Sequence, residues 1–171
     1  MQVIESASEL EASILRLFVI LLGGNETVAA SVYLALDSAG PKTAAIAAVA
    51  KVVLNEKQQL VLTAIQKMER TNRKARDKFA HHTWAFSKDL PDAILLVDPR
   101  ARINDTLSTS DIYVYRAADF KDAIEANNRL SSLTALFRYT LLPWVEMSER
   151  DLRFGQLLAE PEIASRLQSQ A

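Results

Sequence analysis

The chain has 171 residues, a length that suits one folded domain with a sizeable core. Hydrophobic residues make up 49% and charged residues 24%, which is ordinary globular usage and excludes a disordered or low-complexity protein. The net charge of -1 supplies no overall attraction to nucleic acid or to an acidic membrane, so anion binding requires a local patch. The absence of cysteine excludes disulfides, thiol nucleophiles and zinc sites with Cys ligands.

The most apolar early segment, Ile14 to Leu22, contains Arg16. It is shorter than the roughly 20 apolar residues that span a bilayer. It also lacks the basic start and the small-residue cleavage site of a signal peptide. We therefore expect a cytoplasmic protein without a membrane segment, in keeping with the lack of cysteine.

Apolar residues at helical spacing predict three helices in the first third of the chain. The first runs from about Ser6 to Leu22 and ends at Gly23-Gly24, because glycine adopts the left-handed conformation that closes a helix. Asn25 is expected to cap the second helix. We expect Ala39-Gly40-Pro41 to separate it from the third helix, Thr43 to Leu54.

A fourth and longest helix is predicted from Glu56 to His81 or Trp84, with Asn55 as its cap. Its apolar residues form a narrow seam at spacings of three, four or seven, and they are Val61, Ile65, Met68, Ala75 and Phe79. Four cations lie off that seam, where a solvated face is their ordinary role: Lys67, Arg70, Lys74 and Lys78.

Short β-branched and aromatic runs at Ala93–Pro99 and Asp111–Tyr115 predict an antiparallel pair of strands. A fifth helix then covers Ala117 to Leu142, and Pro143 ends it. Short helical stretches follow in a polar tail. The sequence therefore predicts one mainly α domain over residues 1–171. It is a bundle of about five main helices with a small antiparallel β-hairpin inserted around residues 93–116.

The only two histidines, His81 and His82, end the fourth predicted helix. Asp77 lies four residues before His81, and Arg73 four before Asp77, so the three share one side of a helix. His81 lies about 200° around the helix from Phe79, the residue expected in the core, and so points away from the core. Imidazole exchanges protons near neutral pH, a carboxylate fixes its tautomer, and arginine binds phosphate with two parallel hydrogen bonds.

The same segment carries the only concentrated charge. Residues 67–88 include seven basic and two acidic side chains, a net charge of +5, which is able to attract a phosphate chain locally. Trp84 and Phe86 follow and are suited to stacking on bases. Both are equally suited to a core, and for Trp84 the core is the expected place, because a large aromatic residue just after a helix usually covers it.

The segment from Arg76 to His81 resembles the R-x4-6-H motif of HEPN domains (higher eukaryotes and prokaryotes nucleotide-binding). The resemblance implies an all-α bundle that forms a homodimer, and in many members a metal-independent ribonuclease without a cofactor. It implies that Arg76 and His81 are the catalytic residues and Asp77 their polar neighbour. The predicted strands depart from the minimal bundle of that family. We expect contacts to RNA or a nucleotide from the flanking Arg73, Lys74, Lys78 and His82.

The same residues also suit ordinary structural roles. Arg73 and Asp77 fit an exposed ion pair, and histidines at a helix C-terminus are favoured by the helix dipole. Adjacent histidines lack the spacing of zinc ligands, so we expect no metal. The alternative function is a non-enzymatic helical module that binds another protein.

Overall fold

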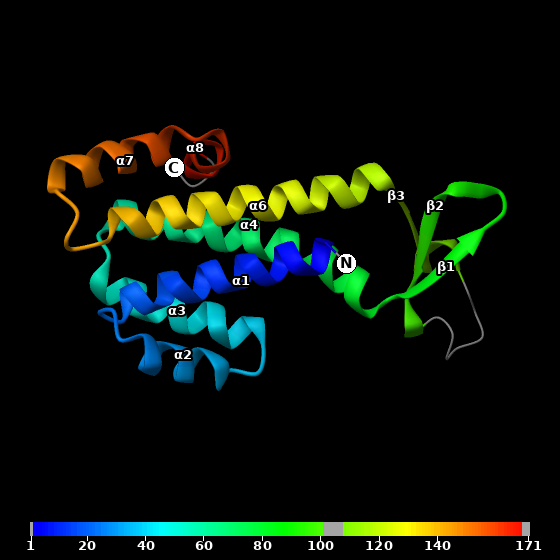
Figure 1. Ribbon diagram of the computed structural model, residues 1–171, viewed down its shortest axis with the longest axis horizontal. Coiled ribbons are helices and arrows are strands. Elements are labelled where there is room, and N and C mark those ends of the chain that lie inside the picture. Colours follow the sequence, from blue (N-terminus) through cyan, green and yellow to red (C-terminus); the bar gives the residue numbers. More distant parts are fainter. Residues whose placement is uncertain (1, 101–107, 169–171) are drawn as a thin grey trace. The chain divides into compact units, whose positions relative to one another are not determined.

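The computed structural model describes residues 2–100 and 108–168, and its fold is mainly α with one small sheet (Figure 1). Seven helices have their bounds within these residues: α1 (Gln2–Leu21), α2 (Glu26–Leu34), α3 (Ala39–Val53), α4 (Glu56–His81), α6 (Ala117–Thr140), α7 (Met147–Ala159) and α8 (Pro161–Gln168). The strands are β1 (Thr83–Ser87), β2 (Leu90–Val97) and β3 (Ile112–Arg116). The predicted fold class, mainly α with a small antiparallel sheet, is confirmed.

The sheet is antiparallel, with strand order β1-β2-β3. The two predicted strands are β2 and β3, which pair from Ala93 opposite Arg116 to Val97 opposite Ile112. The sequence does not predict β1, because its five residues directly follow a strong helical pattern that masks a short alternation. Most of the loop predicted between the two strands, residues 101–107, lies outside the described residues.

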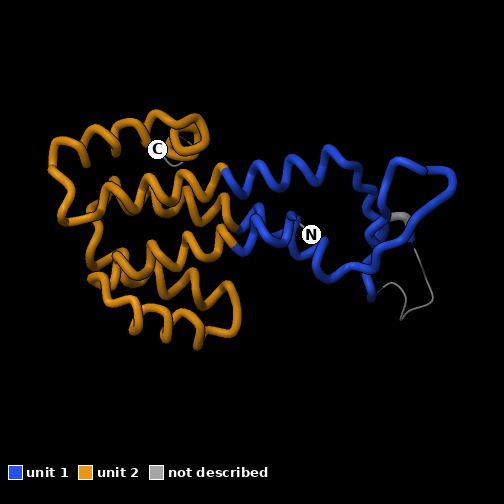
Figure 2. Tube along the Cα trace, viewed as in Figure 1, with its two compact units in different colours: residues 1–8, 70–128 blue, residues 9–69, 129–171 orange. Residues whose placement is uncertain are grey.

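The chain divides into two units, which Figure 2 colours separately. Unit 1 contains residues 1–8 and 70–128, and unit 2 contains residues 9–69 and 129–171. The boundaries between the units fall inside α1, α4 and α6 rather than in loops. No linker composition therefore marks the division, and the sequence-based expectation of one domain stays a prediction.

The core of unit 2 is built by one apolar side of each of its helices. Phe18 and Phe137 are its largest fully buried side chains. Val61 and Ile65 of the predicted seam are buried beside them, and Met68 is half-buried against the same cluster. The seam prediction is therefore correct in this unit. Burial of each such side chain stabilises the fold by roughly 1.5–3 kcal/mol.

The first two helix ends follow the predicted local chemistry. Gly23 and Gly24 have φ angles of 80° and 87°. Gly23 N donates to the Ile20 carbonyl and Gly24 N to the Val19 carbonyl, which is the Schellman pattern of a helix C-terminus. The Asn25 side chain accepts a hydrogen bond from Val28 N at 3.1 Å and caps α2.

Three predicted helix boundaries are wrong. α1 begins at Gln2, four residues before Ser6. α3 begins at Ala39, so Ala39-Gly40-Pro41 forms its first turn instead of a break, because the first turn of a helix needs no proline N–H. α6 ends at Thr140, before Pro143.

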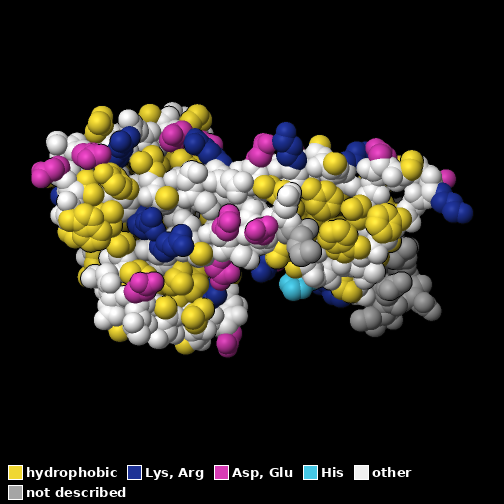
Figure 3. Space-filling model, in the orientation of Figure 1, with side chains coloured by type: hydrophobic (Ala, Val, Ile, Leu, Met, Phe, Trp, Pro, Cys, Tyr) yellow, Lys and Arg dark blue, Asp and Glu magenta, His cyan; other side chains and the backbone are white. Residues whose placement is uncertain are grey.

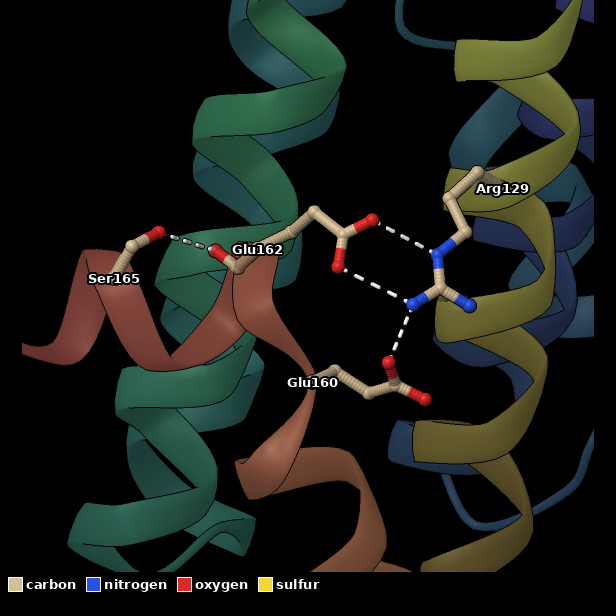
Figure 4. Close-up of polar contacts among 4 residues, drawn as sticks. All are labelled: Arg129, Glu160, Glu162 and Ser165. Carbon is tan, nitrogen blue, oxygen red and sulfur yellow. Dashed lines mark hydrogen bonds and ion pairs between the residues drawn. The ribbon is translucent and has the colours of Figure 1, made fainter.

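The polar C-terminal segment forms two full helices that are attached to α6 by ion pairs (Figure 4). Arg129 on α6 donates to Glu162 from Nε at 2.9 Å and from Nη2 at 3.2 Å, and it also pairs with Glu160. These contacts raise the pKa of Arg129 and lower that of Glu162. Leu157 of α7 and Ile163 of α8 are fully buried in the core of unit 2.

The core of unit 1 is a smaller aromatic cluster between α4, α6 and the sheet. Phe79 lies at its centre, with its ring centroid 4.9 Å from those of both Tyr115 and Phe120. Leu96 of the central strand is fully buried there. Hydrophobic side chains also gather on the face of unit 1 visible in Figure 3, so this core leaves part of its apolar surface uncovered.

Candidate functional site

The candidate site lies on the last turns of α4 and on the sheet that follows it, all within unit 1. A reciprocal pair of hydrogen bonds fixes the start of α4: Asn55 accepts from Gln58 N, and the Gln58 side chain accepts from Asn55 N, each at 3.0 Å. This capping box is the cap that the sequence predicts at Asn55. The other end of the helix is closed by His82 N, which donates to the Lys78 carbonyl at 3.0 Å.

Arg76 and Asp77 are brought together at the surface of α4. Arg76 Nη1 donates to Asp77 Oδ1 at 3.0 Å, and the two side chains are 37% and 46% exposed. This pairing gives Asp77 a different partner from the predicted His81. Arginine has five N–H donors in a rigid fork, so Arg76 keeps donors for a second acceptor while Asp77 holds its position.

His81 is exposed and stands apart from that pair. It lies five residues after Arg76 in a continuous helix, so it is rotated by about 140° and displaced by about 7.5 Å along the axis. No hydrogen bond or ion pair among the described residues links His81 to Arg76 or to Asp77. One copy of the helix therefore presents the guanidinium and the imidazole on different sides.

Lys78 and His82 converge on Tyr113 of β3 instead of pointing into solvent. Lys78 Nζ lies 3.6 Å from the centroid of the Tyr113 ring. The His82 ring meets the same tyrosine edge-on, with 5.6 Å between ring centroids. The His82 Nδ1 atom is shielded from solvent and has no hydrogen-bond partner in the described part of the chain. Lys78 is therefore half-buried and lies off the solvated face predicted for it.

Of the remaining predicted contacts, Lys74 is exposed and Arg73 is half-buried. The exposed lysine is therefore the more accessible cation for an external phosphate. The sequence does not identify Tyr113 as a member of this site. The alternation of aromatic residues in β3 predicts that Tyr113 lies in a strand. It does not predict which side chains of α4 contact the Tyr113 ring.

A second group that the sequence does not reveal is the pair Asp98 and Arg100, after β2. Arg100 donates from Nε and Nη2 to both carboxylate oxygens of Asp98, and its backbone N–H donates to Oδ1 at 2.9 Å. The side-chain hydrogen bonds from Arg100, then its backbone N–H, lower the pKa of Asp98 to about 2.

Trp84 and Phe86 occupy alternate positions of β1. The Trp84 indole Nε1 donates to the Phe79 carbonyl at 3.0 Å, and its ring lies 6.1 Å from that of Phe120. The side chain is nevertheless 47% exposed, while Phe86 is 78% exposed. The expectation of a core position for Trp84 therefore holds for one side of the ring only.

Two kinds of feature are absent from the described part of the chain. No helix within residues 2–100 and 108–168 has the length and apolar character needed to cross a membrane. No three His, Asp or Glu side chains of those ranges cluster as metal ligands do. Compared with models of protein families, with curated proteins and with solved structures, the chain matches none.

Proposed function

We propose that the C-terminal half of α4 binds RNA in the cytoplasm and that Arg76 and His81 cleave it without a metal, as in the HEPN domains that the motif resembles. The observation that supports this most is the accessibility of both groups on one strongly basic helix. Arg76 is held by Asp77 with donors to spare, and His81 is exposed. The surrounding residues 67–88 carry a net charge of +5.

The proposed reaction is attack of a ribose 2′-hydroxyl on the neighbouring phosphate. His81 accepts the proton of the 2′-hydroxyl as its oxygen bonds to phosphorus. The bond from phosphorus to the 5′-oxygen breaks, that oxygen takes a proton from water, and His81 returns its own proton to water. Arg76 stabilises the charge that develops on the phosphate oxygens. The products are a 2′,3′-cyclic phosphate and a 5′-hydroxyl, so atoms and protons balance.

The angular separation of Arg76 and His81 supports a homodimer for this reaction. Because they project about 140° apart from one helix, one copy does not aim both groups at one phosphate. In the proposed dimer Arg76 of one copy and His81 of the other face the same phosphate. Asp77 then keeps the guanidinium in place.

The test is cleavage of single-stranded RNA in EDTA by the full chain and by Arg76→Ala and His81→Ala. Each change is expected to reduce the rate by roughly 100-fold or more. Arg70→Ala is the matched control, because it removes an exposed arginine from the same helix and should keep most of the activity. Equal rates in all four proteins, or no cleavage by any, would remove the catalytic claim.

A mixture of the two inactive variants tests the shared site. In a mixed dimer, one site combines the intact Arg76 of one copy with the intact His81 of the other. The mixture should therefore recover part of the activity that each variant lacks alone. A mixture that stays inactive while dimers form would place both groups in one copy and contradict the proposed arrangement.

A non-enzymatic protein-binding role is supported by a different observation, in unit 2. Val28, Val32 and Leu34 of α2 and Val52 and Val53 of α3 are exposed apolar side chains. Such surface is typical of protein interaction sites. Light scattering of the full chain beside Val28→Ser/Val32→Ser tests self-association there. A dimer that persists in this variant would count against α2 as its interface.

A further inference from the structure

We infer that Trp84 and Phe86 form a platform on which the bases of single-stranded RNA stack. This inference rests on the proposed RNA-binding function and names the form of RNA that the site takes. In β1 the side chains at positions 83, 85 and 87 are half-buried and those at 84 and 86 are exposed. Trp84 and Phe86 are thus two exposed aromatic side chains two residues apart in one strand, and the register of β1 against β2 shifts between Ala85 and Ser87, where Phe86 lies.

The Trp84 ring is held in a fixed orientation. Its N–H is occupied by the Phe79 carbonyl of α4, and one side of the ring packs toward Phe120 of α6. The exposed part of the side chain therefore offers an aromatic surface and no free donor. A ring that is already ordered loses little conformational entropy when a ligand stacks on it. Stacking on a π surface accepts any base.

Phe86 extends this surface with a ring that is 78% exposed. A large aromatic side chain gains nothing for the fold from exposure, because the hydrophobic contribution comes from area removed from water. A flat base stacked on the Phe86 ring removes its apolar surface from water without requiring a matching pocket. A duplex keeps its bases stacked inside, so only a single strand presents the faces that these rings need.

The positive charge of residues 67–88, which include β1, suits a polyanion. β1 begins two residues after the end of α4, on which Lys74 is exposed. Lys88 directly follows β1 and is itself followed by the exposed Asp89. The nearby carboxylate of Asp92 is paired with Arg116, at 3.2 Å from Oδ2 to Nε, which reduces its repulsion. A neutral apolar peptide makes no use of these cations. A single-stranded nucleic acid matches both the rings and the charge.

The decisive comparison uses two RNA strands of equal length and charge. The full chain is titrated with a fluorescently labelled oligouridylate and with an abasic strand that has the same phosphates and no bases. The normal strand is expected to bind about ten-fold more tightly, and Phe86→Ala should remove that difference. Trp144→Ala is the matched control, because Trp144 is 74% exposed but belongs to unit 2. Equal binding of both strands, or unchanged binding by Phe86→Ala, would overturn the inference.

Tryptophan fluorescence reports on the ring itself. The chain has two tryptophans, so Trp144→Phe leaves Trp84 as the single emitter. Oligouridylate is expected to quench this emission, and the abasic strand is not. Single-stranded DNA that quenches equally supports stacking by bases in general. Quenching or a blue shift caused only by phosphatidylserine vesicles would assign the surface to a membrane and reject the platform.

His81→Ala separates this inference from the proposed catalysis. The variant should lose cleavage and keep the full difference in affinity between the normal and abasic strands. If the wild-type protein binds with that preference but never cleaves, the platform stands and the catalytic claim fails. If it cleaves RNA without any preference for bases, the catalytic claim stands and the platform fails.

Discussion

The Lys78 ammonium group lies over the ring of Tyr113, with 3.6 Å between Nζ and the ring centroid. The His82 ring contacts the same tyrosine, at 5.6 Å between centroids. Tyr113 pairs across β2 with Leu96, which is opposite Trp84 in β1. Tyr113 thus contacts the last turns of α4 and lies in the same cross-strand row of the sheet as Trp84.

Lys78→Gln is expected to destabilise the protein by about 0.5–1 kcal/mol, because it removes the attraction between the ammonium and the ring. The same change in a Tyr113→Leu background should have almost no effect, since the ring is already absent. The measurement is a double-mutant cycle by urea unfolding. Lys74→Gln, at an exposed position of α4, is the control and should leave stability nearly unchanged. A coupling energy of zero between Lys78 and Tyr113 would contradict the contact.

Two glycine substitutions are expected to act in opposite directions. Gly23 has a φ of 80°, so Gly23→Ala should destabilise the protein by roughly 1–2 kcal/mol, although nothing lies within 4 Å of the added Cβ. Gly155 lies inside α7 with the same open space, so Gly155→Ala should stabilise it by about 0.5–1 kcal/mol. Thermal unfolding of both variants measures the difference. Equal effects would show that backbone conformation does not govern these sites.

Acid is expected to weaken the attachment of α8 to α6. Hydrogen bonds from Arg129 lower the pKa of Glu162 below its usual 4.5. The contribution of the Arg129–Glu162 contacts to the free energy of unfolding is therefore fully present above the pKa that Glu162 has in the unfolded chain. It is lost as the pH falls through the lower pKa that Glu162 has in the folded protein. Urea unfolding from pH 7 to pH 3 should show this loss in the wild type and a flatter profile in Arg129→Met.

Arg153→Met is the control for that profile. It removes an equal charge from the 3.7 Å pair with Glu149, which is exposed and one helical turn away. The pH dependence of the wild type should persist in this variant. A profile that is equally flat in both variants would show that the effect follows net charge and not the Arg129 contacts.

Asp98 is expected to titrate with a pKa of about 2, because Arg100 stabilises its ionised form. Carboxyl chemical shifts followed by NMR between pH 1 and pH 6 measure this directly. Arg100→Ala should return the pKa of Asp98 toward its usual 3.8, whereas Arg116→Ala, which alters the separate pair with Asp92, should not. A pKa near 3.8 in the wild-type protein would refute the pairing.

The helices and their caps were predictable because their signals are local. Asn25 and Asn55 cap their helices through residues three positions away, and Gly23 requires only its own φ. The buried seam of α4 follows from the 3.6-residue period alone. The same locality explains the errors. The sequence could not tell whether Ala39–Pro41 breaks a helix or opens one, because proline is compatible with both.

The sequence by itself determined a mainly helical protein whose basic segment ends the longest helix, since charge and periodicity are properties of neighbouring residues. Only the tertiary structure decided that Lys78 and His82 meet Tyr113, that Trp84 keeps one side exposed, and that Arg129 engages Glu162. These contacts join residues up to 35 positions apart. Their geometry depends on how the helices and the sheet pack, because side-chain direction across two elements is set by that packing and not by sequence spacing.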